Sequence, residues 1–262
     1  MTEHIYPAFE RGRIMKKELL WALRDYSYTA LQLQYAGYPD GILAGCHIRT
    51  DEQCLYIAPG LIKCQDFLFL IAEEEKLPYF STDYYVSLKF CLLKKETLPD
   101  YISYITEFRL DKKLEQEPNE LELCRFKLKK GARLRTDYND FFDIQTEYDT
   151  VNLADAVWSA AGGNTLSKEI TDYFARKVLE CERAETGDIQ FAYFLLQSKE
   201  AVNYEILMDY IRRKTGFSGE RFLLEKEEAF RQLTDILEGI RQGRSGKGKN
   251  SAFSSSKMIV LD

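Results

Sequence analysis

The sequence predicts an α+β protein: an N-terminal helix, an antiparallel β-rich region, an α-helical region and a basic tail. Two observations predict this order. Alternating or β-branched apolar segments, separated by turn residues, fill the chain up to about residue 150. All six prolines lie at or before Pro118, and apolar residues three and four apart replace the alternation afterwards. We therefore divide the chain into a helical segment, a β-rich domain, an α-helical domain and a flexible tail, at residues 1–35, 36–150, 151–243 and 244–262.

A helix is expected over residues 14–23, where the apolar residues lie close to one helical face. Residues 25–35 either continue this helix or turn towards strand, because Leu31 and Leu33 alternate with polar neighbours.

The stretch over residues 40–72 organises the β-rich region and has the pattern of a small meander of strands. We expect a first strand over residues 42–50, which ends at a polar break. Shorter strands follow at residues 55–58, 61–62 and 67–72.

Four residues are expected to set the geometry of this sheet. Pro59 and Gly60 form a turn pair, in which proline fixes φ and glycine accepts a positive φ. Gly41 and Gly45 flank the first strand, where glycine usually marks a bulge or a backbone that approaches a neighbour closely.

Three further strands are expected before the change in pattern, at residues 84–93, 104–110 and 121–128. The last of these alternates as a half-buried strand does, with a slip at Cys124 that fits a β-bulge.

The second half of the chain predicts helices. The first is expected from an N-cap at Asn152 to the glycines at Gly162, and the second follows Ser167. Residues 188–197 are apolar enough for a buried helix, and residues 200–214 keep one apolar side.

The last helix is expected over residues 222–240, beside a basic, Gly/Ser-rich tail that ends on a short apolar segment. Its apolar stripe either closes the helical core or offers a helix face to a partner. We name it the C-terminal stripe, and its members are Leu223, Phe230, Leu233, Leu237 and Ile240.

Composition limits the function classes. The net charge of -6 argues against general affinity for nucleic acid, which requires a basic surface. No apolar run reaches the ~18–20 residues of a membrane span, and the N-terminus lacks the pattern of a signal peptide, so we expect no direct membrane insertion. Six widely spaced cysteines suit reduced core residues of a cytoplasmic protein.

Two short motifs resemble chemical sites without their context. Gly243, Gly248 and Lys249 match most of a phosphate-binding loop, but a helix precedes them where the motif needs a strand. Cys46 and His47 are adjacent, and neighbours in an extended strand point to opposite faces, so we favour a buried cysteine and a surface histidine. We predict no catalytic residue, no cofactor and no metal site.

An acidic cluster interleaved with aromatic residues leaves three interpretations open. Its carboxylates form a solvated face, an interaction surface, or the acid/base pair of a hydrolase. The cluster comprises Asp137, Asp140, Asp143, Glu147 and Asp149.

Several motifs together resemble the phage tail and baseplate proteins of contractile injection systems, including type VI secretion. They are FERGR at 9–13, YPDGILAG at 38–45, LYIAPG at 55–60, ELELCRFKL at 120–128 and GARLR at 131–135.

This resemblance covers roughly residues 9–143 and implies a non-enzymatic assembly protein of a tail-like particle, in its baseplate. The implied partners are other subunits of the particle, or a second copy, and no small-molecule substrate. The implied location is the bacterial cytoplasm or the particle itself. Two alternatives remain: a carboxylate-dependent hydrolase, and an accessory protein that binds nucleic acid through the tail residues Arg241, Arg244, Lys247 and Lys249.

Overall fold

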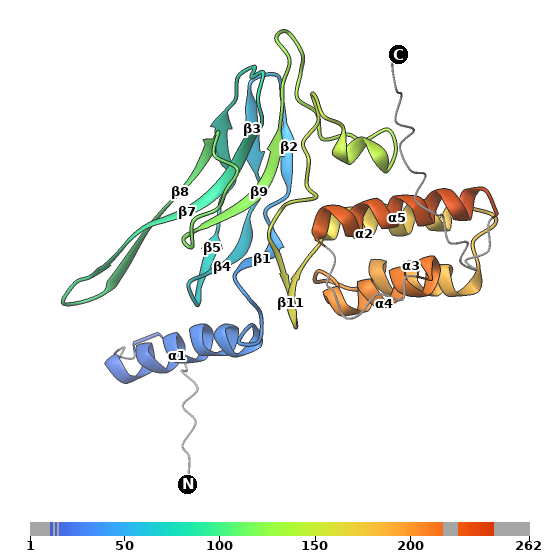
Figure 1. The fold of residues 1–262 in the computed structure, drawn as a ribbon. Helices are drawn as coiled ribbons and strands as arrows, with labels where there is room; N and C mark the ends of the chain where they lie inside the picture. The colour runs from blue at the N-terminus through green and yellow to red at the C-terminus, as the bar shows by residue number, and fades with distance from the viewer. Residues whose placement is uncertain (1–10, 13, 15, 217–224, 244–262) are drawn as a thin grey trace, which may run out of the picture.

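The computed structural model describes residues 11, 12, 14, 16–216 and 225–243 of the 262-residue chain. Its architecture is α+β, as the sequence predicts: an N-terminal helix, three sheets that are largely antiparallel, and a C-terminal group of helices (Figure 1). The sheets and the C-terminal helices share one continuous apolar core.

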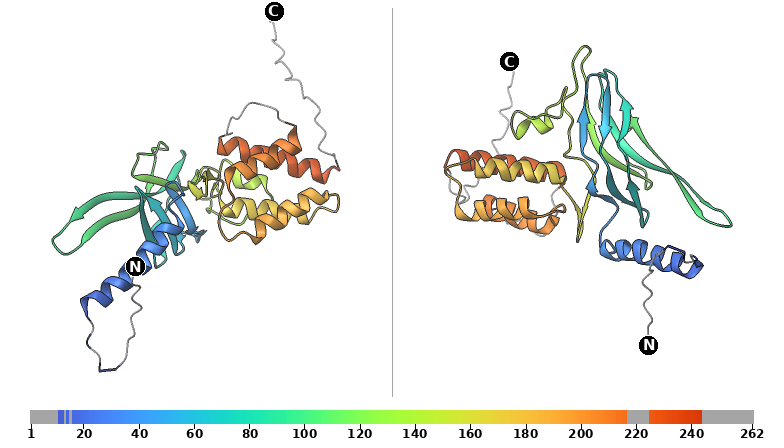
Figure 2. Two further views of the ribbon diagram at one scale, coloured as in Figure 1. Left: turned by 90° about the horizontal axis from the view of Figure 1, so that it is seen from below. Right: turned by 180° about the vertical axis from the view of Figure 1, so that it is seen from behind.

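The N-terminal helix α1 (Lys17–Gln34) resolves the open question about residues 25–35 in favour of helix. None of its residues is buried. It is attached at its C-terminal end, where Leu31 and Tyr35 pack with Leu43 and Leu61 of the first sheet. The rest of α1 extends away from the body of the protein (Figures 1 and 2).

The expected meander is divided between two sheets. The first sheet has the order β11-β10-β1-β4-β5, and the second has the order β2-β3-β6. The single strand predicted over residues 42–50 is therefore wrong, because a break at Cys46 and His47 splits it between the sheets. The bounds are β1 (Gly41–Gly45), β2 (Ile48–Thr50), β3 (Cys54–Ile57), β4 (Gly60–Cys64), β5 (Phe67–Ile71), β6 (Glu75–Pro78), β10 (Trp158–Ala160) and β11 (Gly163–Thr165).

The four strands from β1 to β4 form one bent hairpin. β1 pairs with β4 in the first sheet, and β2 pairs with β3 in the second. Pairing continues across the bend, because the Cys46 amide donates to the Pro59 carbonyl at 3.2 Å and the Ala58 amide donates to the His47 carbonyl at 2.9 Å. A strand pair that changes sheets in this way forms a corner between them.

Two glycines allow the paired backbones of β1 and β4 to approach closely at this corner. Gly45 has φ +67, and a Cβ there would lie 2.1 Å from the Pro59 carbonyl oxygen. Gly60 does not adopt the positive φ expected of it, but a Cβ there would lie 2.4 Å from the Cys46 sulfur. Gly60 is therefore required for space. Gly41 lies at the other end of β1, where a Cβ would lie 2.9 Å from the Val157 carbonyl oxygen.

The third sheet has the order β8-β7-β9, with β7 (Val86–Thr97), β8 (Ile102–Asp111) and β9 (Glu120–Phe126). The bulge expected near Cys124 is confirmed, because the register with β7 shifts between Leu88 and Lys89. The half-buried character predicted for β9 is wrong, since both of its faces are buried. Stacked and tilted aromatic rings join this sheet to β5, among them Phe69 and Phe90 at 5.3 Å.

The helix predicted after Asn152 is also wrong. The Asn152 side chain accepts from the Ala154 amide at 2.8 Å, which forms a turn that resembles an N-cap in sequence. Residues 158–160 then become β10, which pairs in parallel with β1, and the glycines at 162 and 163 lead into β11.

Four helices close the C-terminal part, and they pack in pairs (Figure 2). The expected cap at Ser167 is confirmed, since its side chain accepts from the Ile170 amide. A short 3-10 helix, η1, lies between β9 and these helices (Figure 1). The bounds are η1 (Phe142–Gln145), α2 (Lys168–Leu179), α3 (Thr186–Gln197), α4 (Tyr204–Thr215) and α5 (Lys226–Arg241).

Replacing Gly45 by alanine tests the corner. We expect Gly45→Ala to lower the free energy of unfolding by about 3 kcal/mol, since it combines a positive φ with a clash against backbone. The matched control is Gly37→Ala, because a Cβ at Gly37 meets nothing within 4 Å. Urea unfolding of both variants measures the difference, and an equal effect at the two positions would contradict the corner's role.

Candidate interaction surface

Six of the large apolar side chains that are exposed lie on α1. Trp21 is 45% exposed and Leu33 is 71% exposed, and these residues lie on different sides of the helix. Most helical stability in proteins comes from packing of an apolar face and not from helix propensity. A helix that exposes several large apolar side chains and buries none of its residues is therefore typical of a segment that packs against another molecule. The exposed apolar residues of α1 are Leu20, Trp21, Leu23, Tyr26, Tyr28 and Leu33.

A groove of about 300 Å³ lies between α1 and the first sheet. Its walls are mainly apolar, and Leu70 of β5 is 74% exposed there. Leu31 and Leu61 line the groove and also belong to the apolar cluster that attaches α1 to the first sheet. The groove is therefore continuous with the contact between α1 and the sheet. We call α1 and this groove together the α1 platform. The groove is lined by Ser27, Tyr28, Leu31, Gln32, Leu61, Phe67, Leu68 and Leu70.

Most of the acidic cluster forms a solvated face, because Asp137, Asp140 and Glu147 are exposed. Two of its carboxylates have separate basic partners. Asp143 is buried, and Arg135 donates to both of its carboxylate oxygens, at 2.5 and 2.6 Å. This contact lowers the pKa of Asp143 to about 2. Glu147 pairs with Lys127 at 2.9 Å. Each of these two carboxylates thus neutralises a base of the same loop region, and none of the cluster lines the hollow between this loop and α2.

Cys46 and His47 are separated as predicted, although they lie in the bend and not in a strand. Cys46 is buried, and burial raises the pKa of its thiol to about 12. His47 lies at the surface, where its Nδ1 is 2.6 Å from Glu169 of α2. A hollow of about 360 Å³ opens beside His47 and Glu169, between the bend and α2. The contact between His47 and Glu169 therefore links the hairpin corner to the helices.

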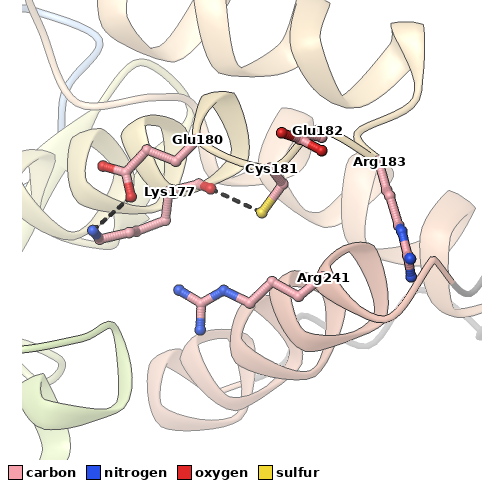
Figure 3. A pocket seen from close by; sticks show the side chains of 6 residues that line it. All are labelled: Lys177, Glu180, Cys181, Glu182, Arg183 and Arg241. Carbon is pink, nitrogen blue, oxygen red and sulfur yellow. Dashed lines mark hydrogen bonds and ion pairs between the residues drawn. The ribbon is translucent and has the colours of Figure 1, made fainter.

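A second polar hollow, of about 320 Å³, lies between the end of α2 and the end of α5 (Figure 3). Lys177 pairs there with Glu180 at 2.7 Å, and the Cys181 thiol donates to the Lys177 carbonyl. Arg183 and Arg241 also line this hollow (Figure 3). No histidine lines this hollow, so the thiol has no imidazole base among the described lining residues.

The C-terminal stripe packs inside the protein. Phe230, Leu233, Leu237 and Ile240 are all buried, and the Phe230 ring stacks on Phe141 at 4.7 Å. In this structure the stripe closes the helical core. Binding of the stripe to a partner stays a prediction, and it would require α5 to separate from the helices that now bury the stripe. Leu223 lies outside the described residues. The described residues also exclude the end of the phosphate-loop-like motif, at Gly248 and Lys249, and the basic tail residues after Arg241.

The described residues contain no group of three or more His, Cys, Asp or Glu side chains that could hold a metal ion. No described helix has the length and the apolar character needed to cross a membrane.

No protein-family model and no curated protein matches the chain. Several solved structures overlap with it. A crystal structure of TssK has a TM-score of 0.39 at 10% identity, over 95% of this chain and 71% of that chain. The type VI secretion system TssK-TssF-TssG baseplate subcomplex has a TM-score of 0.39 at 11% identity, over 92% and 100%. The baseplate complex from the type VI secretion system has a TM-score of 0.35 at 10% identity, over 90% and 100%.

These structural neighbours are type VI secretion baseplate proteins, and at TM-scores below 0.5 the likeness by itself supports no function for this chain. The α1 platform was not predicted from the sequence. The available signal was the spread of Leu20, Trp21 and Leu33 around the helix, which one amphipathic face does not explain.

The contact between His47 and Glu169 predicts that the stability of the protein depends on pH. The hydrogen bond to Glu169, followed by the charges of Glu169 and Asp172, raises the pKa of His47 above the 6.5 of a free histidine, against the effect of partial burial. A raised folded pKa means that the stabilisation is fully present below pH 6.5 and is lost as pH rises through the folded value.

We therefore expect Glu169→Gln to return the pKa of His47 towards 6.5 and to remove this part of the pH dependence of stability. NMR titration of the imidazole in the wild type and the variant measures the shift. The other histidine, His4, gives the second imidazole signal in the same spectra. A His47 that titrates at or below 6.5 in the wild type would contradict the ion pair.

Proposed function

We propose that this chain is a structural component of a contractile, phage-tail-like particle, located in its baseplate and acting through protein–protein interfaces. The observation that carries the proposal is α1, an 18-residue helix without a buried residue that is attached to the first sheet at one end. Helices of this kind gain their stability by packing, so a partner that covers α1 completes its environment.

Two further observations support an assembly role. The sequence motifs within residues 9–143 resemble tail and baseplate proteins. The candidate reactive groups are already engaged in structural contacts: Asp143 by Arg135, His47 by Glu169, and Cys46 by burial. A hydrolase would need two carboxylates facing each other across a cleft, and the paired state of Asp143 does not favour that alternative.

The proposed partners are neighbouring subunits of the particle, and the proposed location is the bacterial cytoplasm or the assembled particle. Sheath, tube and spike genes beside the gene for this chain would support the proposal directly.

A charge on the α1 platform tests it. We expect Trp21→Asp to reduce co-purification of the other particle subunits by about tenfold, since buried aromatic anchors dominate interfaces. The matched control is Phe80→Asp, because Phe80 is also exposed, at 62%, and lies in the connection between β6 and β7. Quantitative mass spectrometry of material purified on the tagged chain gives the ratio.

The proposal fails if the wild-type chain recovers no tail-like subunits from producing cells. The platform assignment fails if Trp21→Asp and Phe80→Asp recover the same amounts.

A further inference from the structure

The hairpin of β7 and β8 extends as an arm from the third sheet (Figures 1 and 2). β7 pairs with β8 up to Thr97 and Ile102, but its last partner in β9 is reached at Cys91 and Glu120. Beyond that point the arm is a two-stranded ribbon. Ribbons of two strands are only marginally stable in water and need a third strand or a packed face.

The two outer strands of the third sheet differ in their edges. The β9 edge is covered in part, because Arg125 and Asn152 exchange both backbone hydrogen bonds, at 3.0 and 2.8 Å. β8 is hydrogen-bonded to β7 alone among the described strands. β6 contacts β8, but its own hydrogen bonds belong to the second sheet.

The distal part of β8 carries neither a charge nor a proline, and the register shift of this hairpin, between Leu92 and Lys94, lies in β7. Natural edges carry charges, prolines or bulges that prevent pairing with another chain. Residues 101–106 read YISYIT, with no charge and no proline, and Ile102 is 51% exposed. Such uncharged segments of high β-propensity are the ones that accept another strand.

The backbone groups of this edge alternate in direction. The Leu98 amide donates to the Tyr101 carbonyl at 2.9 Å, which closes the hairpin. Because bonded and non-bonded pairs alternate in an antiparallel ladder, the next residue, Ile102, directs its N–H and C=O away from β7, and so does Tyr104. These groups form the pairing edge.

We propose that this β8 edge pairs antiparallel with the same edge of a second copy of the chain, joining the two arms into one four-stranded sheet. The segment is compatible with itself. A two-fold axis through Tyr104 places Ile102 opposite Thr106 and keeps equivalent faces on the same side of the joined sheet. No two like charges face each other, and the next pair outward is Tyr101 opposite Glu107. The pairing uses the β8 edge of each copy, so no β8 edge is left for a third chain and the assembly closes as a dimer.

Three variants of Ile102 test the dimer in the purified full chain. Ile102→Pro removes an N–H of the pairing edge and leaves the bonds to β7, since proline is tolerated where its missing N–H faces outward. Ile102→Lys keeps the N–H and adds an edge charge, which also opposes pairing. Ile102→Thr keeps both the N–H and the β-branched shape and is the matched control.

Sedimentation velocity over a range of concentrations should give a wild-type species of twice the 30.6 kDa of one chain at high concentration. Each change acts twice in a two-fold dimer, so Ile102→Pro and Ile102→Lys should each raise the dissociation constant roughly tenfold or more. Ile102→Thr should stay near the wild-type value.

A wild-type chain that remains monomeric at its highest soluble concentration overturns the proposal, including the case in which a strand from a different protein occupies the edge. A dimer that Ile102→Pro and Ile102→Lys leave unchanged overturns it as well. The Ile102→Lys variant covers the case in which the proline variant does not fold. The outcome is independent of the proposed particle function, because it is measured without other subunits.

Discussion

The close approach of the Gly45 and Gly60 backbones is the constraint on which the rest of the β-rich region depends. The two residues are direct partners in the register of β1 and β4, and there is no room for a Cβ at either. Their approach lets one hairpin supply strands to two sheets. The inner face of the first sheet then packs into the main core, and its outer face holds Leu43 and Leu61 for α1. The position of α1 thus follows from the corner.

The buried charges of the same scaffold are satisfied by ion pairs and hydrogen bonds, so ionisable groups at these positions need not indicate catalysis. Lys89 is fully buried in β7, and it pairs with Glu120 at 2.9 Å and donates to the Glu115 carbonyl at 2.6 Å. Glu122 of β9 is also fully buried, and Arg125 donates to both of its oxygens. Buried charges of this kind are costly unless they are paired and hydrogen-bonded, and here they are.

Much of the fold could be predicted from the sequence, and the failures have physical causes. Apolar alternation located most of the strands before residue 130, but it missed β6, β10 and β11. Three–four spacing located the last helices. The break after Gly45 was missed because Cys46 adopts a positive φ of 55° without being glycine, which pattern reading does not anticipate. Asn152 resembles a helix cap in sequence because the same side chain also stabilises turns. The exposure of α1 and the burial of the stripe depend on long-range packing, which no local pattern contains.

Hydrogen exchange of the α1 amides, in the free chain and in the assembled particle, tests most directly whether this is a scaffold that presents a helix to a partner. In the free chain, α1 should exchange rapidly along most of its length, while β1 and β4 stay protected, since exchange follows local burial. In the particle, the α1 amides should become protected. An α1 that exchanges at the same rate in both states would contradict the account.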